Sequence, residues 1–497
     1  MMDKQLLWRL AKSDYLKLVP ILALAFYLTF IPHMNYPYPV HIDEWRHLVN
    51  FNAITKAGST TFVEPLMGQG IRTITTNLET GYHVFWSVFH SITGIPWLVI
   101  FRYFPGVIFI ITVLSVYIMA SREGFGWEAA LCTCLITTTV GILGPGFLVP
   151  VAMGLLFLAL SLFLVFNFKT WWSYLVLFLF ICFLLSMHAT TAVGLIIILI
   201  PYILLNLRGN FKHSLGITLA LATPFLILFP WIFSIVLNEA EGLLTQYTHS
   251  QYVDIPHVIR AYGYLPIALC LLGTASLVMR GGKKSYGMVL GLLSILIVLV
   301  VYFTFHYGIQ PLYTRSLMYM MLMVSIVAGA GLMWVRKLSL PEKLGAWIKA
   351  PFITRNMGNF LCIVLVVVIL AITIPDRLDT PYYYMIDNED YEAFVWIKNN
   401  IDESYDRAIL DPWKATPFAT ITGKYVYTRI HVAPVAKDEE AYAFIRNGSS
   451  NTTFLRDNGI SMLYTRIHDG SKNNNYSVNN TDLVKLADNI YILKELK

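Results

Sequence analysis

Long apolar runs, repeated from the N-terminus to about residue 375, constrain this chain more than any other feature. A helix needs roughly 17–25 mostly apolar residues to cross a bilayer, where its backbone must satisfy its own hydrogen bonds. The runs predict eleven spans: Leu18–Pro32, Trp97–Ala120, Trp127–Leu143, Phe147–Phe166, Trp171–Met187, Thr190–Leu207, Ser214–Leu237, Tyr264–Met279, Ser285–Thr304, Ser316–Val335 and Phe360–Pro375. The breaks at Gly144–Pro145 and His188 also allow a re-entrant hairpin in place of one span. Only 13% of the residues are charged, about half the share in soluble proteins, so we predict a polytopic α-helical membrane protein.

The distribution of basic residues predicts how these spans are oriented. With Met1 in the cytoplasm, the inner segments carry sixteen Lys and Arg residues, whereas the outer loops before residue 376 carry only five. This asymmetry obeys the positive-inside rule, and an odd number of spans then places the C-terminus outside. The net charge of +6 follows the same topology, so we expect the chain to bind membrane lipids and no nucleic acid.

Composition predicts two domains. Residues 1–375 form a transmembrane module whose residues 33–96 are a long first outer loop, and residues 376–497 form a small α/β domain outside the membrane. Within the second domain, helical spacing is expected at Asn388–Asn400, Asp438–Arg446 and Asp482–Asp488, and strands at Arg407–Leu410, Lys424–Tyr427, Ser461–Tyr464 and Asn489–Leu493. Four N-x-Ser/Thr sequons, which start at Asn447, Asn451, Asn475 and Asn479, all lie in this domain and agree with an outer location.

The first outer loop opens with an unusually polar stretch, His41–His47. Its carboxylates, Asp43 and Glu44, are candidate catalytic groups, because a carboxylate at a membrane surface can act as a general base. Asp43 with His41 could instead hold a divalent cation, the one cofactor we consider. His47 lies one helical turn beyond Asp43 and can face the same site. Asp43 is also suited to a purely structural role as the N-cap of a helix over Glu44–Ile54.

Five further residues are candidates for binding a substrate. Arg315 opens a late span and can hold a phosphate through its planar fork of donors, with His306 and Tyr313 as hydrogen-bonding neighbours; an arginine there can equally bind lipid headgroups in general. His188 ends a span on the same predicted outer face, although a lone histidine is more often structural. Arg102 is costly inside hydrocarbon and is expected to reach the outer interface or to pair with Glu64 or Glu79.

Together these features resemble the GT-C superfamily of integral-membrane glycosyltransferases. The superfamily includes protein O-mannosyltransferases, the aminoarabinose transferase of lipid A and the catalytic subunit of oligosaccharyltransferase. The resemblance rests on Asp43-Glu44, the stretch Glu79–Gly94, Arg102-Tyr103-Phe104-Pro105, Met187-His188-Ala189-Thr190, Arg315, Ala328–Gly331 and the tail stretch Tyr391–Gly423. The tail resembles the extracytoplasmic domain of archaeal-type members. Two features depart from oligosaccharyltransferases: Asp411-Pro412-Trp413-Lys414 stands where they have WWDYG, and the second outer loop, Gly141–Pro150, has no acid.

The resemblance implies an inverting glycosyltransferase at the cell membrane, with its active site and C-terminal domain extracytoplasmic. It would transfer a hexosyl or pentosyl group from a polyprenyl-phosphate donor to a lipid, glycan or protein acceptor. Asp43 or Glu44 would serve as base and Arg315 as the donor-phosphate clamp. Two other functions remain open: a transporter or flippase of lipid-linked substrates, which needs polar residues near the midplane, and a non-catalytic, glycan-binding scaffold.

Overall fold

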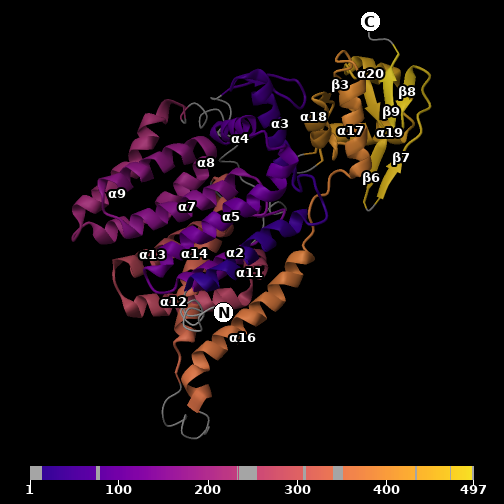
Figure 1. Ribbon diagram of the computed structural model, residues 1–497. Coiled ribbons are helices and arrows are strands. Elements are labelled where there is room, and N and C mark those ends of the chain that lie inside the picture. Colours follow the sequence, from indigo (N-terminus) through magenta and orange to yellow (C-terminus); the bar gives the residue numbers. More distant parts are fainter. Residues whose placement is uncertain are drawn as a thin grey trace, which may run out of the picture. The chain divides into compact units, whose positions relative to one another are not determined.

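The computed structural model describes residues 14–73, 79–231, 233, 255–305, 309–339, 351–430, 434–470 and 472–494 (Figure 1). They form two compact units: the membrane unit, Met1–Asn35 with Val99–Tyr382, and the outer unit, Tyr36–Leu98 with Tyr383–Lys497. This grouping differs from the predicted domains, because the first outer loop belongs with the tail and not with the spans. Backbone hydrogen bonds join the two segments directly: Val426 N–H donates to the Leu66 carbonyl over 2.8 Å.

The membrane unit is a bundle of helices. Its elements are α2 (Asp14–Phe30), η1 (Ile31–His33), α5 (Trp97–Ser121), α6 (Gly126–Cys134), α7 (Pro150–Asn167), α8 (Trp171–Asn206), α9 (Phe211–Ile227), α11 (Ile255–Tyr262), α12 (Tyr264–Arg280), α13 (Lys283–Phe305), α14 (Gln310–Arg336) and α16 (Pro351–Leu378). Within the described residues, seven helices are long and apolar enough to cross a membrane, and α9 and α12 are shorter apolar helices. The chain is therefore a multi-pass membrane protein, although these helices do not establish the predicted count of eleven.

Helix α14 is the centre of this bundle, since 94% of its apolar stretch is buried. Small residues let α12 approach it closely. A Cβ atom added to Gly273 would lie 1.9 Å from the Val327 carbonyl oxygen, and one added to Gly331 would lie 2.0 Å from the Leu269 carbonyl oxygen. Such contacts are typical of membrane helix pairs, where close backbone packing replaces the hydrophobic effect as the driving force.

Three predicted spans take a different form. Over Trp127–Leu143, helix α6 ends at Cys134, and irregular chain with a single bridge between Thr139 and Leu143 follows. The Thr137–Thr139 run and the nearby glycines disfavour a continuous helix. The spans on either side of His188 are two arms of α8, in which His188 has the non-helical backbone angles φ −161° and ψ 81°. The break predicted at His188 is confirmed.

The outer unit combines the first outer loop with an α/β domain. The loop supplies α3 (Ile42–Ala57), β1 (Phe62–Val63), β2 (Ile71–Arg72) and α4 (Thr80–Thr93). The tail supplies α17 (Asn388–Asn400), β3 (Arg407–Ile409), α18 (Ala415–Thr422), β4 (Tyr425–Val426), α19 (Ala436–Arg446), α20 (Thr452–Asp457), β5 (Met462–Tyr464), β6 (Arg466–Asp469), β7 (Lys472–Asn475), β8 (Leu483–Ala487) and β9 (Ile490–Leu493). Strands β4, β3 and β5 are parallel, and β9 and β8 continue the sheet antiparallel.

Most elements predicted for the tail are confirmed, and α17 has the predicted bounds. The helix predicted at Asp482–Asp488 is wrong, because β8 occupies Leu483–Ala487 and pairs with β9, with Leu483 opposite Leu493. Leu483 and Leu486 have the i, i+3 spacing of a helix, but the neighbouring strand supplies backbone partners that a sequence window does not contain.

We expect Gly273→Ala to destabilise the membrane unit by about 1–3 kcal/mol, because its methyl group has no room against the backbone of α14. The thermal unfolding midpoint of the full chain in detergent measures this. Leu271→Ala is the matched control, since Leu271 lies on the same helix and is largely exposed. Equal midpoints for the two variants would contradict the tight α12–α14 crossing.

Candidate functional site

The N-terminus of α3 fixes the predicted acidic pair. His41 is extended and caps the helix, its Nδ1 accepting the Asp43 N–H over 3.1 Å. The prediction that Asp43 is the N-cap of this helix is therefore wrong. The N-cap is His41, because its ring Nδ1 accepts the backbone N–H that the Asp43 carboxylate was expected to accept. The Asp43 carboxylate lies 3.7 Å from the same Nδ1. With Nδ1 already accepting a backbone hydrogen bond, the structure gives no added support to a cation held by Asp43 and His41.

The two adjacent carboxylates have different environments. The Glu44 side chain is fully buried, and its Oε2 accepts the Val40 N–H over 2.8 Å, which secures the turn that enters α3. Asp43 keeps 23% of its side-chain surface exposed. A general base must reach its acceptor, so Asp43 is the better placed of the two.

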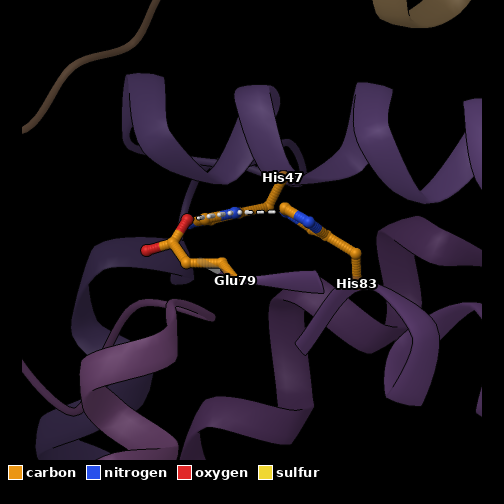
Figure 2. A group of neighbouring side chains, drawn as sticks. All are labelled: His47, Glu79 and His83. Atoms are coloured by element: carbon orange, nitrogen blue, oxygen red, sulfur yellow. Dashed lines mark hydrogen bonds and ion pairs between the residues drawn. The ribbon is translucent and has the colours of Figure 1, made fainter. Parts of the chain in front are cut away.

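Three residues behind Asp43 form a donor set suited to a metal ion, which we call the His–Glu triad: His47 from α3, and Glu79 and His83 from the start of α4 (Figure 2). His47 Nδ1 lies 3.0 Å from His83 Nε2 and 3.9 Å from Glu79 Oε2. All three ligand atoms lie within 4.8 Å of one another. Burial, and after it the nearby His47, Arg46 and Arg72, holds the pKa of His83 well below its usual range, so its imidazole is neutral and can coordinate.

Arg429 of the tail lies within electrostatic range of Arg46, Arg72 and Asp43 of the first outer loop. Burial first, and then the Arg46 guanidinium, lower the pKa of Arg429 to about 10, while Arg72 adds to this and Asp43 opposes it. Arg429 Nη1 is buried without a hydrogen-bond partner among the described residues. Glu64 also acts on Arg429, so three guanidinium groups face two carboxylates, Asp43 and Glu64, and the group keeps one net positive charge that can attract an anion.

Sequence reasoning did not select His83 or Arg429, and it considered Glu79 only as a partner for Arg102, not as a metal ligand. Glu79 and His83 stand four residues apart at a helix start, a spacing typical of paired ligands on one helical face, so that signal was available. Nothing in the local sequence distinguishes Arg429, because only the packing of the tail against the loop brings it near Asp43.

The other predicted substrate-binding residues belong to the membrane unit. His188 Nδ1 lies 2.6 Å from Thr191 Oγ1, which in turn lies 2.8 Å from the Tyr319 hydroxyl on α14. Arg315 is one turn before Tyr319 on the same helix, so the structure connects these two predicted residues through α14. The ring of Tyr313 stacks on Tyr302 with centroids 3.9 Å apart.

The remaining two predictions have simpler outcomes. The Arg102 guanidinium lies over the rings of Phe30 and Tyr103, 5.6 Å from each centroid. The alternative partner Glu64 accepts the Met67 N–H over 2.7 Å within its own loop. His306 lies outside the described residues.

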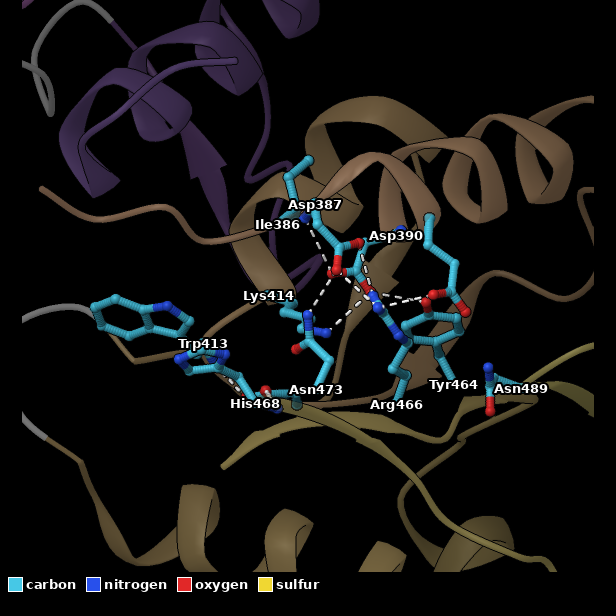
Figure 3. Close-up of polar contacts among 12 residues, drawn as sticks. Ile386, Asp387, Asp390, Trp413, Lys414, Tyr464, Arg466, His468, Asn473 and Asn489 are labelled. Carbon is cyan, nitrogen blue, oxygen red and sulfur yellow. Dashed lines mark hydrogen bonds and ion pairs between the residues drawn. The ribbon is translucent and has the colours of Figure 1, made fainter. Parts of the chain in front are cut away.

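A charged network fixes the N-terminus of α17 to the strands of the tail (Figure 3). Arg466 binds both oxygens of Asp387 over 2.7 Å and lies 2.8 Å from Asp390 Oδ1. The buried Asp390 also accepts hydrogen bonds from Lys414 Nζ over 2.9 Å and the Tyr464 hydroxyl over 2.8 Å. Each buried charge therefore has opposite charge and hydrogen bonds around it, as burial requires.

Solved structures of an archaeal protein share this architecture. The apo oligosaccharyltransferase of Archaeoglobus fulgidus matches at a TM-score of 0.62 and 10% identity, over 90% of this chain and 69% of that one. The chain has the GT-C fold. The same archaeal protein, AglB, with an inhibitory peptide and dolichol-phosphate matches at a TM-score of 0.59 and 11% identity, over 91% and 69%. The complex of the A. fulgidus oligosaccharyltransferase with Zn and sulfate matches at a TM-score of 0.56 and 10% identity, over 90% of this chain and 67% of that one. No family model matches the chain, and no curated protein matches its sequence.

On this GT-C fold, the tail stretch Asp411-Pro412-Trp413-Lys414 is largely structural. Asp411 is buried and accepts the N–H groups of Trp413 and His468, over 2.9 and 2.7 Å. Lys414 is held by Asp390. Trp413 remains partly exposed, and its ring meets Tyr383 edge-on at 5.2 Å, while Tyr383 lies 5.4 Å from the ring of His41. A row of rings thus joins the tail to the start of α3.

We expect Asp390→Asn to disrupt the tail, because it leaves Arg466 and Lys414 facing a neutral group in a buried site. Breaking such a pair costs about 3–5 kcal/mol, so hydrogen-exchange protection of residues 388–400 in the full chain should fall by roughly two to four orders of magnitude. Glu389→Gln is the matched control. Glu389 also contacts Arg466 but is 60% exposed, so its loss should change protection less than about fivefold. Similar losses of protection in both variants would contradict the assignment of Asp390 as the buried centre of this network.

Proposed function

We propose that this chain is a glycosyltransferase that moves one sugar from a polyprenyl-phosphate donor to an extracytoplasmic acceptor. The observation that carries the proposal is a partly exposed carboxylate, Asp43, held beside an arginine cluster on a GT-C fold. The AglB complex with dolichol-phosphate supports a lipid-linked donor. A membrane-embedded fold suits such a donor, because its lipid tail can enter sideways from the bilayer.

In the proposed reaction, the acceptor hydroxyl attacks the anomeric carbon of the donor sugar. Asp43 takes the hydroxyl proton as the new carbon–oxygen bond forms, and the bond from that carbon to the phosphate oxygen breaks. The polyprenyl phosphate leaves with the bonding electron pair. Because phosphate is a good leaving group, no general acid is needed, and a single displacement inverts the anomeric centre.

The negative charge that develops on the phosphate needs cationic partners. Arg315 is the proposed clamp, since a guanidinium binds phosphate oxygens in pairs. The Tyr319 hydroxyl, one turn along α14 and bonded to Thr191, helps to hold that part of the helix in place. Arg46, Arg72 and Arg429 provide further positive charge beside Asp43, which favours an anionic donor there.

We also propose that the His–Glu triad binds a divalent cation of the zinc type. Two histidines and one glutamate are a common zinc donor set that leaves a fourth position open. Two nitrogens on a tetrahedral Zn²⁺ lie roughly 3.3 Å apart, close to the 3.0 Å between His47 Nδ1 and His83 Nε2. When bound, the ion would add positive charge one helical turn from Asp43. The Zn complex of AglB is consistent with a cation in this fold.

We expect Asp43→Asn to lower the transfer rate by about 10²–10⁴-fold, the usual contribution of a general base. The variant should fold normally, because the cap of α3 is a hydrogen bond from the Asp43 backbone N–H to His41, and this bond does not involve the Asp43 carboxylate. Release of polyprenyl phosphate from a synthetic lipid-linked sugar measures the rate, and the unfolding midpoint measures the fold. Asp488→Asn, at a 93% exposed acid of the tail, is the control. Full activity in Asp43→Asn would refute the mechanism.

Zinc binding is expected to require the triad. His83→Gln should weaken Zn²⁺ binding by full-length protein at least tenfold in calorimetry, whereas His90→Gln, on the same helix but bonded to the Ile95 carbonyl, should not. Protons compete for imidazole nitrogen, so affinity should fall as the pH drops. The lowered pKa of His83 predicts that this ligand becomes protonated only below the ordinary histidine range near 6.5. Equal zinc affinity in the two variants would exclude the triad as the site.

A further inference from the structure

The membrane unit contains an open groove that has no part in the proposed reaction. It has a volume of about 630 Å³ and lies among α2, α6, α14 and α16. Helix α16 buries only 22% of its apolar stretch within the chain, so it contacts the bundle loosely enough to leave this space beside it. The groove is of a size that commonly holds small ligands.

The walls of the groove consist mostly of apolar side chains. Ile21 and Leu24 of α2 lie on one helical stripe, and Cys362, Val366 and Leu370 of α16 lie on another. The α16 stripe continues over eight residues, or roughly 12 Å at 1.5 Å per residue. Two apolar stripes therefore line one groove, a surface suited to a hydrocarbon chain.

One end of the groove carries positive charge. The Lys17 Nζ lies 5.5 Å from the centre of the Trp127 ring, and the Arg336 guanidinium lies 5.4 Å from the same ring. The buried Glu128 pairs with Arg336 over 2.7 Å. These three ionised groups sum to one positive charge, and Arg336 Nε has no hydrogen-bond partner among the described residues. Two cations sharing one indole favour an anion between or beside them.

The polar end also lies at a membrane boundary. Lys17 is near the start of α2, Arg336 is the last residue of α14, and Asn359 lies near the start of the apolar part of α16. All three line the groove. The positive-inside pattern assigns these helix ends to the cytoplasmic leaflet, opposite to the face where Asp43 is expected to work.

We propose that this groove binds one anionic phospholipid of the cytoplasmic leaflet. The phosphate of the headgroup contacts Lys17 and Arg336, and an acyl chain lies between the stripes of α2 and α16. Basic pockets between membrane helices on this face are suited to such headgroups. The proposal is independent of the catalytic function, because it uses none of the residues assigned to transfer.

The test measures lipid retention by the delipidated full-length protein in detergent, by native mass spectrometry, with phosphatidylglycerol and phosphatidylcholine of identical chains. We expect one phosphatidylglycerol to bind about fivefold or more tightly than phosphatidylcholine, roughly the effect of one basic residue near an anionic lipid. Lys17→Gln should abolish this preference. Lys169→Gln, an exposed lysine outside the groove on the same predicted face, should keep it.

A second pair of variants tests the apolar part. Val366→Trp should fill the groove and reduce retention of both lipids, whereas Val364→Trp, two residues away and outside the lining, should not. Equal binding of the two phospholipids by the unmodified protein, or equal behaviour of Lys17→Gln and Lys169→Gln, would overturn the proposal. Displacement of phosphatidylglycerol by an equal concentration of undecaprenyl phosphate would overturn it too, by making the groove a site for donor lipid.

Discussion

The packing of α3 against the tail helix α18 is the contact on which the candidate site depends. Trp45 of α3 is almost fully buried, and its carbonyl accepts the Thr420 hydroxyl over 3.3 Å. Asn52, two turns later, donates to the Thr420 carbonyl. These contacts make the first outer loop and the tail one compact unit, so that Asp43 and Arg429, nearly four hundred positions apart in sequence, belong to a single electrostatic environment.

The acidic and basic residues of the polar stretch that opens the loop differ in how deeply they are buried. His41 and Glu44 accept backbone N–H groups at the entrance to α3, and the buried Glu44 is enclosed on all sides. Asp43 is left partly exposed between them. The charged network around Asp390 has a structural role in the tail, because its ions are paired with one another. Dense charge alone therefore does not distinguish a candidate catalytic carboxylate from a structural one.

Several parts of the site could be predicted from local sequence, and others could not. Helix α3, the helix within Glu79–Gly94 and the break at His188 follow from apolar spacing and from residues that disfavour continuous helix. The cap at His41 was mistaken for Asp43, since ring geometry decides which of two neighbouring acceptors reaches the amide. The strand β8 was mistaken for a helix, because its hydrogen-bond partners lie in β9. The Trp127–Leu143 run was apolar enough to span, yet its threonines and glycines end α6 early.

By itself, the sequence determined that the chain crosses a membrane many times, because hydrocarbon admits only apolar segments with satisfied backbones, and it located one acidic candidate outside those segments. Only the tertiary structure decided that the first outer loop belongs with the tail, that Glu44 is buried against the Val40 N–H, and that His47, Glu79 and His83 converge. Those outcomes depend on side chains from distant segments sharing a few ångströms of space. Hydropathy is a property of each segment alone, whereas a site is a property of how segments pack.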